Sequence, residues 1–267
     1  MLLSLLAATA FPAGAQDAEA GAGASFVDEF DRIDPARWYK SDGWANGTHQ
    51  NCTWSKKNVH IVDGTLELVL EPEDAGAATE GRPYSCAEMQ THDSYGYGTY
   101  EVRMRPAAAS GLVSAFFTYI GPRPDAPNPH DEIDIEFLGK DRHAVQLNYF
   151  GEAKGGHEYM APLPFDASQT MADYAFEWAP DAIRWYLNGE LMHEEKRQEG
   201  TPFPNTPGKI MLSIWGGVDL DGWLGKFDYP GQPLIARYDR IAFTKAGEKC
   251  QFPESIVCRR HGKSARN

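Results

Sequence analysis

Apolar and polar residues alternate along much of this chain. In Thr65–Glu71, for example, Leu66, Leu68 and Leu70 fall on one face. The same period of two recurs in Thr99–Arg105, Leu112–Ile120, Ala144–Phe150, Tyr174–Trp178 and Lys209–Trp215. Because successive side chains of a strand point to opposite faces, these segments are predicted to be half-buried strands. No stretch longer than about twelve residues has a helical period.

Turn signals separate these predicted strands. Ala182–Leu187 and Glu190–Glu194 flank Asn188-Gly189, a strong hairpin signal. The chain has 18 Pro and 26 Gly, and Gly121–Pro129 has the composition of a loop. Many short strands in one chain of 267 residues predict a single all-β domain. We expect a two-sheet antiparallel jelly-roll sandwich whose concave face forms a substrate cleft.

The segment His130–Asp141 contains an unusual row of acids. Glu132, Asp134 and Glu136 alternate with apolar residues, so all three are predicted on one face of a strand. Like charges in a row destabilise a sheet. An edge strand protected by charge is one alternative. Calcium binding is another, although the segment lacks the Gly and carbonyl spacing of a calcium loop.

Glycoside hydrolysis explains the row best. Retaining glycosidases need two carboxyl groups about 5–5.5 Å apart, one as nucleophile and one as proton donor. Glu132 and Glu136 are roughly 13 Å apart at Cα for a rise near 3.3 Å per residue, and their long side chains can lean together. Asp134 between them can hydrogen-bond to one glutamate, and its charge keeps a proton on the other.

The motif DEIDIEFLGKD resembles the signature of glycoside hydrolase family 16, in its mixed-linkage β-glucanase branch. Family-like motifs follow in the family's order over roughly residues 25–244: Ser41–Gly47, Asn51–Trp54, Tyr95–Met104, Ser114–Pro122, Val145–Phe150 and Asp221–Phe227. The resemblance implies a concanavalin A-like fold. It also implies that Glu132 is the nucleophile, Asp134 its assistant and Glu136 the acid/base.

Three features depart from the mixed-linkage β-glucanases. His130 stands where those enzymes have Trp, Gln90 stands where they have a cleft Arg, and Glu248–Cys258 extends past their end. All three resemble the bacterial glycanases that depolymerise succinoglycan, an acidic exopolysaccharide. The resemblance therefore favours a succinoglycan-type substrate, with mixed-linkage β-glucan as the alternative.

A sugar-binding cleft needs flat aromatic rings and polar hydrogen-bonding groups. The candidate aromatic contacts are Trp44, Phe117, Tyr119, Phe150, Trp215 and Trp223. The candidate polar contacts are Asn46, Glu88, Gln90, His130, Asp131, Gln146 and Asn148.

The four cysteines allow three disulfide connectivities. Because Cys250 and Cys258 lie close together in a C-terminal tail, we favour pairing them, which leaves Cys52 with Cys86. The latter pair also matches the disulfide of the resembled branch. The cysteine spacings match no zinc site. No cofactor is expected for catalysis.

The resemblance also implies a structural calcium. The matching groups are the backbone carbonyls of Glu29 and Gly64 and the side chain of Asp239. Calcium prefers such oxygen ligands. We expect it to act on stability and not on catalysis.

Residues 1–15 have the pattern of a signal peptide. We expect a flexible leader at 16–24, the catalytic domain at 25–244 and a tail with a disulfide at 245–267. We therefore expect a secreted or periplasmic monomer without a membrane anchor after cleavage. The formal net charge of −13 argues against nucleic acid as partner and weakly disfavours a polyanionic substrate held by charge. The acid row and the resemblance indicate a polysaccharide partner. A retaining endoglycanase is the favoured function. A transglycosylase and a non-catalytic carbohydrate-binding protein are the alternatives.

Overall fold

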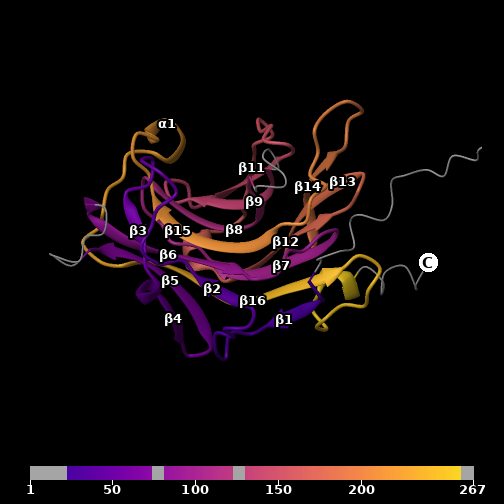
Figure 1. Ribbon diagram of the computed structural model, residues 1–267, viewed down its shortest axis with the longest axis horizontal. Coiled ribbons are helices and arrows are strands. Elements are labelled where there is room, and N and C mark those ends of the chain that lie inside the picture. Colours follow the sequence, from indigo (N-terminus) through magenta and orange to yellow (C-terminus); the bar gives the residue numbers. More distant parts are fainter. Residues whose placement is uncertain (1–22, 74–80, 123–129, 260–267) are drawn as a thin grey trace, which may run out of the picture.

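Two β-sheets pack face to face in the computed structural model, which describes residues 23–73, 81–122 and 130–259 (Figure 1). The first sheet, called the cleft sheet below, has the order β11-β10-β9-β8-β15-β6. Its strands are β6 (Tyr84–Thr91), β8 (Leu112–Ile120), β9 (Asp131–Leu138), β10 (Ala144–Phe150), β11 (Tyr159–Pro162) and β15 (Lys209–Gly216). β2 (Trp38–Lys40) pairs antiparallel and β3 (Cys52–Trp54) parallel with β6.

The second sheet, called the outer sheet, has the order β5-β16-β7-β12-β13-β14. Its strands are β5 (Thr65–Pro72), β7 (Gly98–Arg105), β12 (Ala172–Trp178), β13 (Ala182–Leu187), β14 (Glu190–Lys196) and β16 (Leu234–Lys245). β1 (Phe26–Asp28) pairs with β16, and β4 (Val59–Val62) pairs with β5. The short helical elements include η1 (Lys56–Asn58), η3 (Ala167–Gln169) and α1 (Asp221–Leu224), and residues 256–259 form a further helical turn. The predicted antiparallel jelly-roll sandwich is confirmed.

Aromatic residues fill the space between the sheets. Tyr100 and Phe176 of the outer sheet stack at 4.6 Å between ring centroids, and Phe116 of the cleft sheet packs against Phe176 at 5.9 Å. Tyr238 of β16 donates its hydroxyl to the carbonyl of Ala115 on β8 at 2.9 Å. The polar tips of buried aromatics thus tie the outer sheet to the backbone beneath the cleft.

The predicted hairpin at Asn188-Gly189 is confirmed. β13 and β14 pair antiparallel up to Leu187 opposite Glu190. Asn188 has φ of 49° and Gly189 has φ of 85°. Two consecutive positive φ values define the turn type whose twist matches the flanking strands, and Asn-Gly adopts it readily.

β16 was not predicted as a strand. It is twelve residues long and pairs with β5 on one side and β7 on the other. Its register with β7 shifts between Tyr238 and Arg240. A bulge of this kind interrupts the alternation that identifies strands in a sequence.

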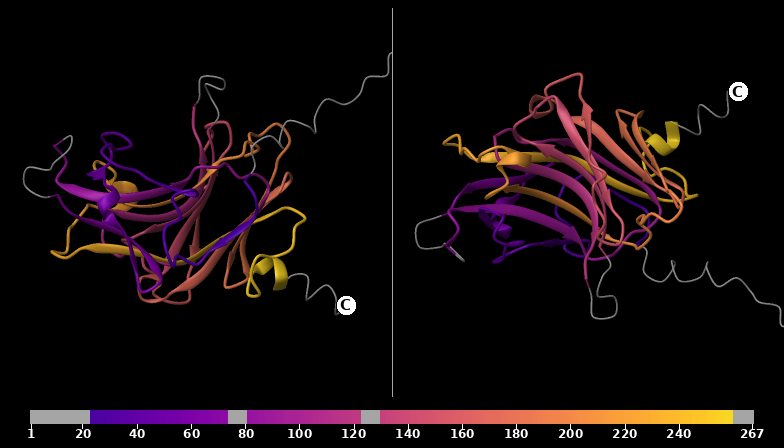
Figure 2. Two further views of the ribbon diagram at one scale, coloured as in Figure 1. Left: turned by 60° about the horizontal axis from the view of Figure 1, so that its bottom comes forward. Right: turned by 90° about the horizontal axis from the view of Figure 1, so that it is seen from above.

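The C-terminal segment folds back onto the outer sheet. Glu101 of β7 is buried and accepts hydrogen bonds from the Ser255 hydroxyl at 2.6 Å and the Ile256 amide at 2.9 Å. Ile256 packs in a cluster with Ala175 and Tyr186. Figure 2 shows this segment beside the outer sheet, at the end of the chain that the structure describes. The segment therefore belongs to the folded domain.

Both predicted disulfides are present, with Cα–Cα distances of 5.7 Å for Cys52–Cys86 and 5.4 Å for Cys250–Cys258. Residues 1–22, 123–129 of the predicted loop, and 260–267 of the tail lie outside the described residues. Within the described ranges, no helix is long and apolar enough to cross a membrane.

Replacing Cys52 and Cys86 with serine is expected to lower the free energy of unfolding by roughly 3–4 kcal/mol. The bridge closes a loop with a sequence separation of 34, against 8 for Cys250–Cys258, and the entropy lost by the unfolded chain grows with loop length. Urea unfolding of the two double serine variants tests this. An equal or larger loss for the shorter loop would contradict the expected order.

Candidate active site

β9 carries the three predicted acids through the interior of the cleft sheet. It pairs with β8 on one side and β10 on the other. Glu132, Asp134 and Glu136 line a cleft, while Ile133 and Ile135 are buried in the core. Because both edges of β9 are hydrogen-bonded, the alternative of a charge-protected edge strand is wrong.

β10 places a polar residue opposite two of the three acids. Asn148 of β10 lies opposite Asp134, and Gln146 lies opposite Glu136. From below, Trp185 of the outer sheet donates its indole N–H to the Asp134 carbonyl at 3.0 Å. The backbone at the centre of the row is therefore fixed by both sheets.

Burial and the charges of neighbouring acids raise the pKa values of two of these carboxyl groups. Burial raises the pKa of Glu136 to about 8, with the charges of Glu132 and Glu158 adding to the effect. Burial also raises the pKa of Asp134 well above its usual range, assisted by the charges of Glu132 and Glu136 and by a hydrogen bond to Glu132. At neutral pH, Glu136 thus holds a proton, and the shift of the Asp134 pKa favours its protonated form. A carboxyl group whose pKa is raised in this way suits the role of proton donor.

A cleft of about 1280 Å³ opens above β9. This volume exceeds the range of roughly 300–1,000 Å³ found for small-molecule pockets and suits a polymer segment. Twelve of the thirteen predicted contact residues line it: Trp44, Asn46, Glu88, Gln90, Phe117, Tyr119, His130, Gln146, Asn148, Phe150, Trp215 and Trp223.

Several of these polar groups are already bound to neighbours. Ser41 donates its hydroxyl to Glu88 at 2.5 Å, and burial raises the pKa of Glu88 to about 7 against the effect of that bond. Lys209 Nζ donates to Gln90 Oε1 at 2.9 Å. A sugar would meet side chains that are already oriented, which lowers the entropic cost of binding.

Some of the ring side chains that line the cleft lie against one another. The rings of Trp215 and Trp223 lie 6.1 Å apart, and the indole N–H of Trp223 donates to Gln146 Oε1 at 2.9 Å. His49 meets Trp215 edge-on at 5.7 Å. Such rings offer the flat apolar surface that the face of a sugar requires.

Comparison with known proteins decides the family. The model for Glycosyl hydrolases family 16 matches residues 46–231. The chain is 50% identical over 234 residues to the Endo-1,3-1,4-beta-glycanase ExoK of Rhizobium meliloti (strain 1021), covering 88% of this chain and 84% of that protein. The chain belongs to glycoside hydrolase family 16. It is also 42% identical to the Beta-glucanase of Bacillus subtilis (strain 168), over 92% of this chain and 94% of that one.

Solved structures of family 16 enzymes match the sandwich as a whole. The beta-glucanase of Bacillus licheniformis aligns with a TM-score of 0.76 and 42% identity, over 84% of this chain and 99% of that one. A lichenase from a mouse hindgut metagenome aligns with a TM-score of 0.75 and 44% identity, over 83% and 99%. With its acids on the cleft floor, the protein is a glycoside hydrolase and not a non-catalytic binding protein.

The structure corrects the prediction that Asp131 contacts substrate. Its carboxylate accepts the backbone N–H groups of Glu152, Asn205 and Thr206 at 2.8–2.9 Å and is buried. Asp131 has the same parity along β9 as Ile133, so its side chain points away from the acids. Its role is to anchor two loops beside the cleft.

Other residues that line the cleft were missed in the sequence. Lys209 lies on the same face of β15 as Trp215, so the alternation of that strand could have identified it. His49 and Glu158 lie outside the predicted strands, and tertiary structure brings them to the cleft. The charge of Glu158 acts on Glu136, which makes it part of the electrostatic environment of the acids.

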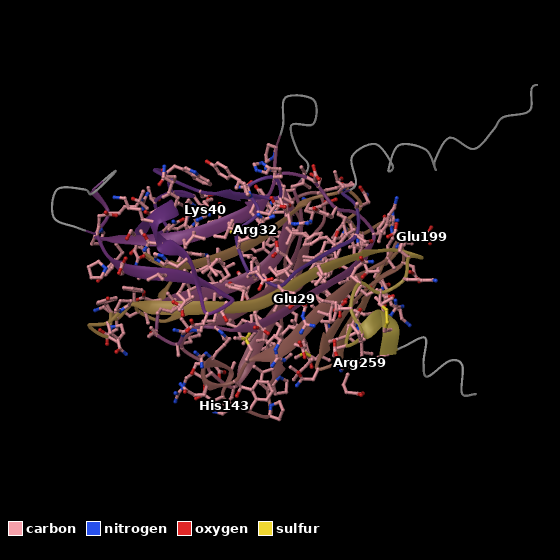
Figure 3. All side chains as sticks on the ribbon, turned by 90° about the horizontal axis from the view of Figure 1, so that it is seen from below. Glu29, Arg32, Lys40, His143, Glu199 and Arg259 are labelled. Atoms are coloured by element: carbon pink, nitrogen blue, oxygen red, sulfur yellow. A yellow bond between two sulfur atoms is a disulfide. The ribbon has the colours of Figure 1, made fainter. Side chains whose placement is uncertain are left out.

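The three groups expected to hold calcium lie near one another on the outer sheet. β1 ends with Asp28 opposite Ile241, and β5 begins its pairing with β16 at Leu66 opposite Tyr238. Glu29 and Gly64, next to these ends, therefore approach the β16 bulge at Asp239. Figure 3 shows Glu29 on the face seen from below. Asp239 Oδ2 is paired with Arg103 Nε at 3.1 Å, so a calcium ion would share this carboxylate with a guanidinium.

The raised pKa of Glu136 should make the free energy of unfolding depend on pH. Its pKa is about 8 in the folded protein, against an ordinary value of 4.5. Between these values the folded state holds a proton that the unfolded state has released, so the free energy of unfolding falls as the pH rises. Glu136→Gln cannot ionise and is expected to gain a few kcal/mol relative to the native protein between pH 5 and pH 8.5.

Urea unfolding at the two pH values measures this difference. Glu67→Gln is the matched control, because Glu67 pairs with Arg237 at 2.8 Å on the outer sheet, away from the cleft. If Glu136→Gln and the native protein lose the same free energy over this range, Glu136 is not protonated at neutral pH.

Proposed function

We propose that this family 16 enzyme is a retaining endo-β-1,3-1,4-glycanase that cleaves a bacterial exopolysaccharide of the succinoglycan type. The observation that carries the proposal is the row Glu132, Asp134 and Glu136 in the lining of a large cleft. A cleft too large for a single sugar suits attack within a chain. The names of the ExoK relative at 50% identity and of the metagenomic lichenase at 44% identity supply the linkage.

In the first step of this mechanism, an oxygen of Glu132 attacks the anomeric carbon of the sugar. The glycosidic bond breaks, and the leaving oxygen takes the proton held by Glu136. In the second step, water attacks the same carbon, its proton passes to Glu136, and the bond to Glu132 breaks. Two inversions give net retention.

Asp134 supports this exchange from the middle of the row. Its hydrogen bond to Glu132 connects it to the nucleophile, and Asn148 bonds to it from β10. A protonated Asp134 can donate to the Glu132 carboxylate and orient it. Two carboxyl groups suffice for the reaction, so no cofactor is needed for catalysis.

The substrate class is supported by the sequence features that depart from mixed-linkage β-glucanases. Gln90 and His130 both line the cleft, and the disulfide-bearing tail docks on the outer sheet. Lys209, bound to Gln90, supplies a positive charge on the cleft wall. A cation in this position suits a polymer with acidic substituents.

A reducing-end assay tests which polymer the enzyme prefers. The assay is run in parallel on succinoglycan, lichenan, laminarin and xyloglucan. We expect the highest kcat/KM on succinoglycan. Equal or faster cleavage of lichenan would identify a mixed-linkage β-glucanase instead. Product sizes separate hydrolysis from transfer, because oligosaccharides longer than the substrate form only when a sugar replaces water as acceptor.

We propose further that the protein acts outside the cytoplasm, secreted or periplasmic, as a monomer. Its two disulfides suit an oxidising compartment. The signal peptide expected at residues 1–15 would direct export, and fractionation of cells that express the whole chain tests this.

The structural calcium stays a prediction of the resemblance. If calcium binds at Glu29, Gly64 and Asp239, a chelator is expected to lower the melting temperature, because a ligand of the folded state stabilises it by mass action. Asp239→Ala should remove this sensitivity. A melting temperature that does not change with chelator would show that no calcium is bound.

A further inference from the structure

One side chain in the cleft is bonded directly to the proposed nucleophile. His130 Nε2 lies 2.6 Å from Glu132 Oε2. An ionised carboxylate only accepts hydrogen bonds, so the imidazole must carry a proton on Nε2 and donate it. This bond holds one oxygen of the Glu132 carboxylate, to which Asp134 also bonds from the same strand.

The protein holds the imidazole ring independently of any sugar. Phe150 stacks on it with centroids 4.8 Å apart and an interplanar angle of 13°. Tyr119 meets it edge-on at 5.3 Å. The His130 carbonyl also accepts the amide of Ala153 at 2.9 Å. Since ring and backbone are both fixed, the donor is in place before substrate binds.

We propose that His130 is a positioning residue that holds the Glu132 carboxylate in place and stabilises it as the leaving group when the glycosyl-enzyme is hydrolysed. This inference rests on the proposed function, in which Glu132 is the nucleophile. In the second step, water bonds to the anomeric carbon, its proton passes to the Glu136 carboxylate, and the ester bond to Glu132 breaks. The electron pair of that bond returns to Glu132, where His130 donates its hydrogen bond.

The electrostatic surroundings strengthen this pair. The hydrogen bond to Glu132 raises the pKa of His130, and the nearby charges of Glu132 and Asp131 act in the same direction against burial. A hydrogen bond to a charged acceptor is stronger than one to a neutral ester oxygen. His130 therefore stabilises free Glu132 more than it stabilises the intermediate.

Because His130 stabilises the free carboxylate more than the ester, its removal should affect the two chemical steps in opposite ways. Without the donor, Glu132 is more basic and attacks at least as well, but it is a poorer leaving group. The second step should then slow by about 10-fold to 100-fold, as expected for the loss of one hydrogen bond to a charge. Because the intermediate accumulates, kcat and KM should fall together. A residue that only contacted sugar would instead raise KM when removed.

Two substitutions distinguish the effect of the hydrogen-bond donor of His130 from the effect of its ring. His130→Phe keeps a planar ring for Phe150 and Tyr119 but has no donor, whereas His130→Gln keeps an N–H donor near the position of Nε2 but has no ring. Each enzyme is trapped with an aryl 2-deoxy-2-fluoro-β-glycoside of a β-glucan disaccharide and freed of excess reagent. Recovery of activity then measures the second step alone.

We expect His130→Phe to reactivate about 10-fold to 100-fold more slowly than the native enzyme, and His130→Gln to restore most of the rate. Reactivation of His130→Phe at the native rate would overturn the inference, and so would a Gln variant as slow as the Phe variant. If the Phe variant fails to fold, His130→Leu takes its place with the same expectation. Absence of a trapped adduct on the native enzyme would instead overturn the covalent mechanism of the proposed function.

Discussion

Glu132→Ala is expected to lower kcat/KM by about 10⁴-fold or more, since removal of a nucleophile costs this much in comparable covalent enzymes. The first chemical step needs an oxygen of Glu132 at the anomeric carbon. Burial raises the pKa of its neighbour Glu136 to about 8 and shifts the pKa of Asp134 upward, so both favour their protonated forms. Neither neighbour can replace it, because a protonated carboxyl group is a poor nucleophile.

Azide should partly restore turnover of Glu132→Ala. The small anion can enter the space left by the carboxylate and attack once, so the product is the α-glycosyl azide. Glu67→Ala, on the outer sheet, is the control for loss of a carboxylate elsewhere and should keep native activity. Recovery of no azide product, or of the β-glycosyl azide, would show that Glu132 is not the nucleophile.

Glu136→Ala is expected to reduce cleavage of the natural polymer by about 10²-fold to 10⁴-fold, the usual contribution of a general acid–base group. An aryl glycoside with a good leaving group needs no proton in the first step, so that step should be nearly unchanged. Hydrolysis of the intermediate still needs the base. A burst of aryl leaving group, followed by slow turnover and a low KM, is therefore expected.

The same residue sets the alkaline limb of the pH profile. The pKa of Glu136 is about 8, so kcat/KM on the polymer should fall above that pH as the acid loses its proton. With the activated aryl glycoside, Glu136→Ala should lack this limb. A native profile that stays flat to pH 10 on the polymer would contradict the assignment of Glu136 as the acid.

The row of three acids could be predicted from the sequence because the alternation of side chains along a strand depends only on neighbouring residues. The period of two that places Glu132, Asp134 and Glu136 in the cleft also places Asp131 on the opposite face. The prediction for Asp131 failed because this residue shares the parity of the buried Ile133 and not that of the three acids. Lys209 could have been found by the same parity argument.

Other parts of the molecule depend on contacts between distant segments. The bulge near Asp239 breaks the pattern of β16, and Trp185 reaches Asp134 from the other sheet. Glu158 and His49 join the cleft only after the chain has folded. Likewise, the sequence places His130 two residues before Glu132, but only the structure shows the hydrogen bond between them.

The anomeric form of the first product tests the account most directly. Proton NMR during the first minutes of polymer cleavage, before mutarotation, reports the configuration at the new reducing end. If Glu132 and Glu136 act as nucleophile and acid/base, the β anomer appears first and the α anomer grows in later. Initial appearance of the α anomer would mean a single displacement by water, and the double-displacement mechanism would be wrong.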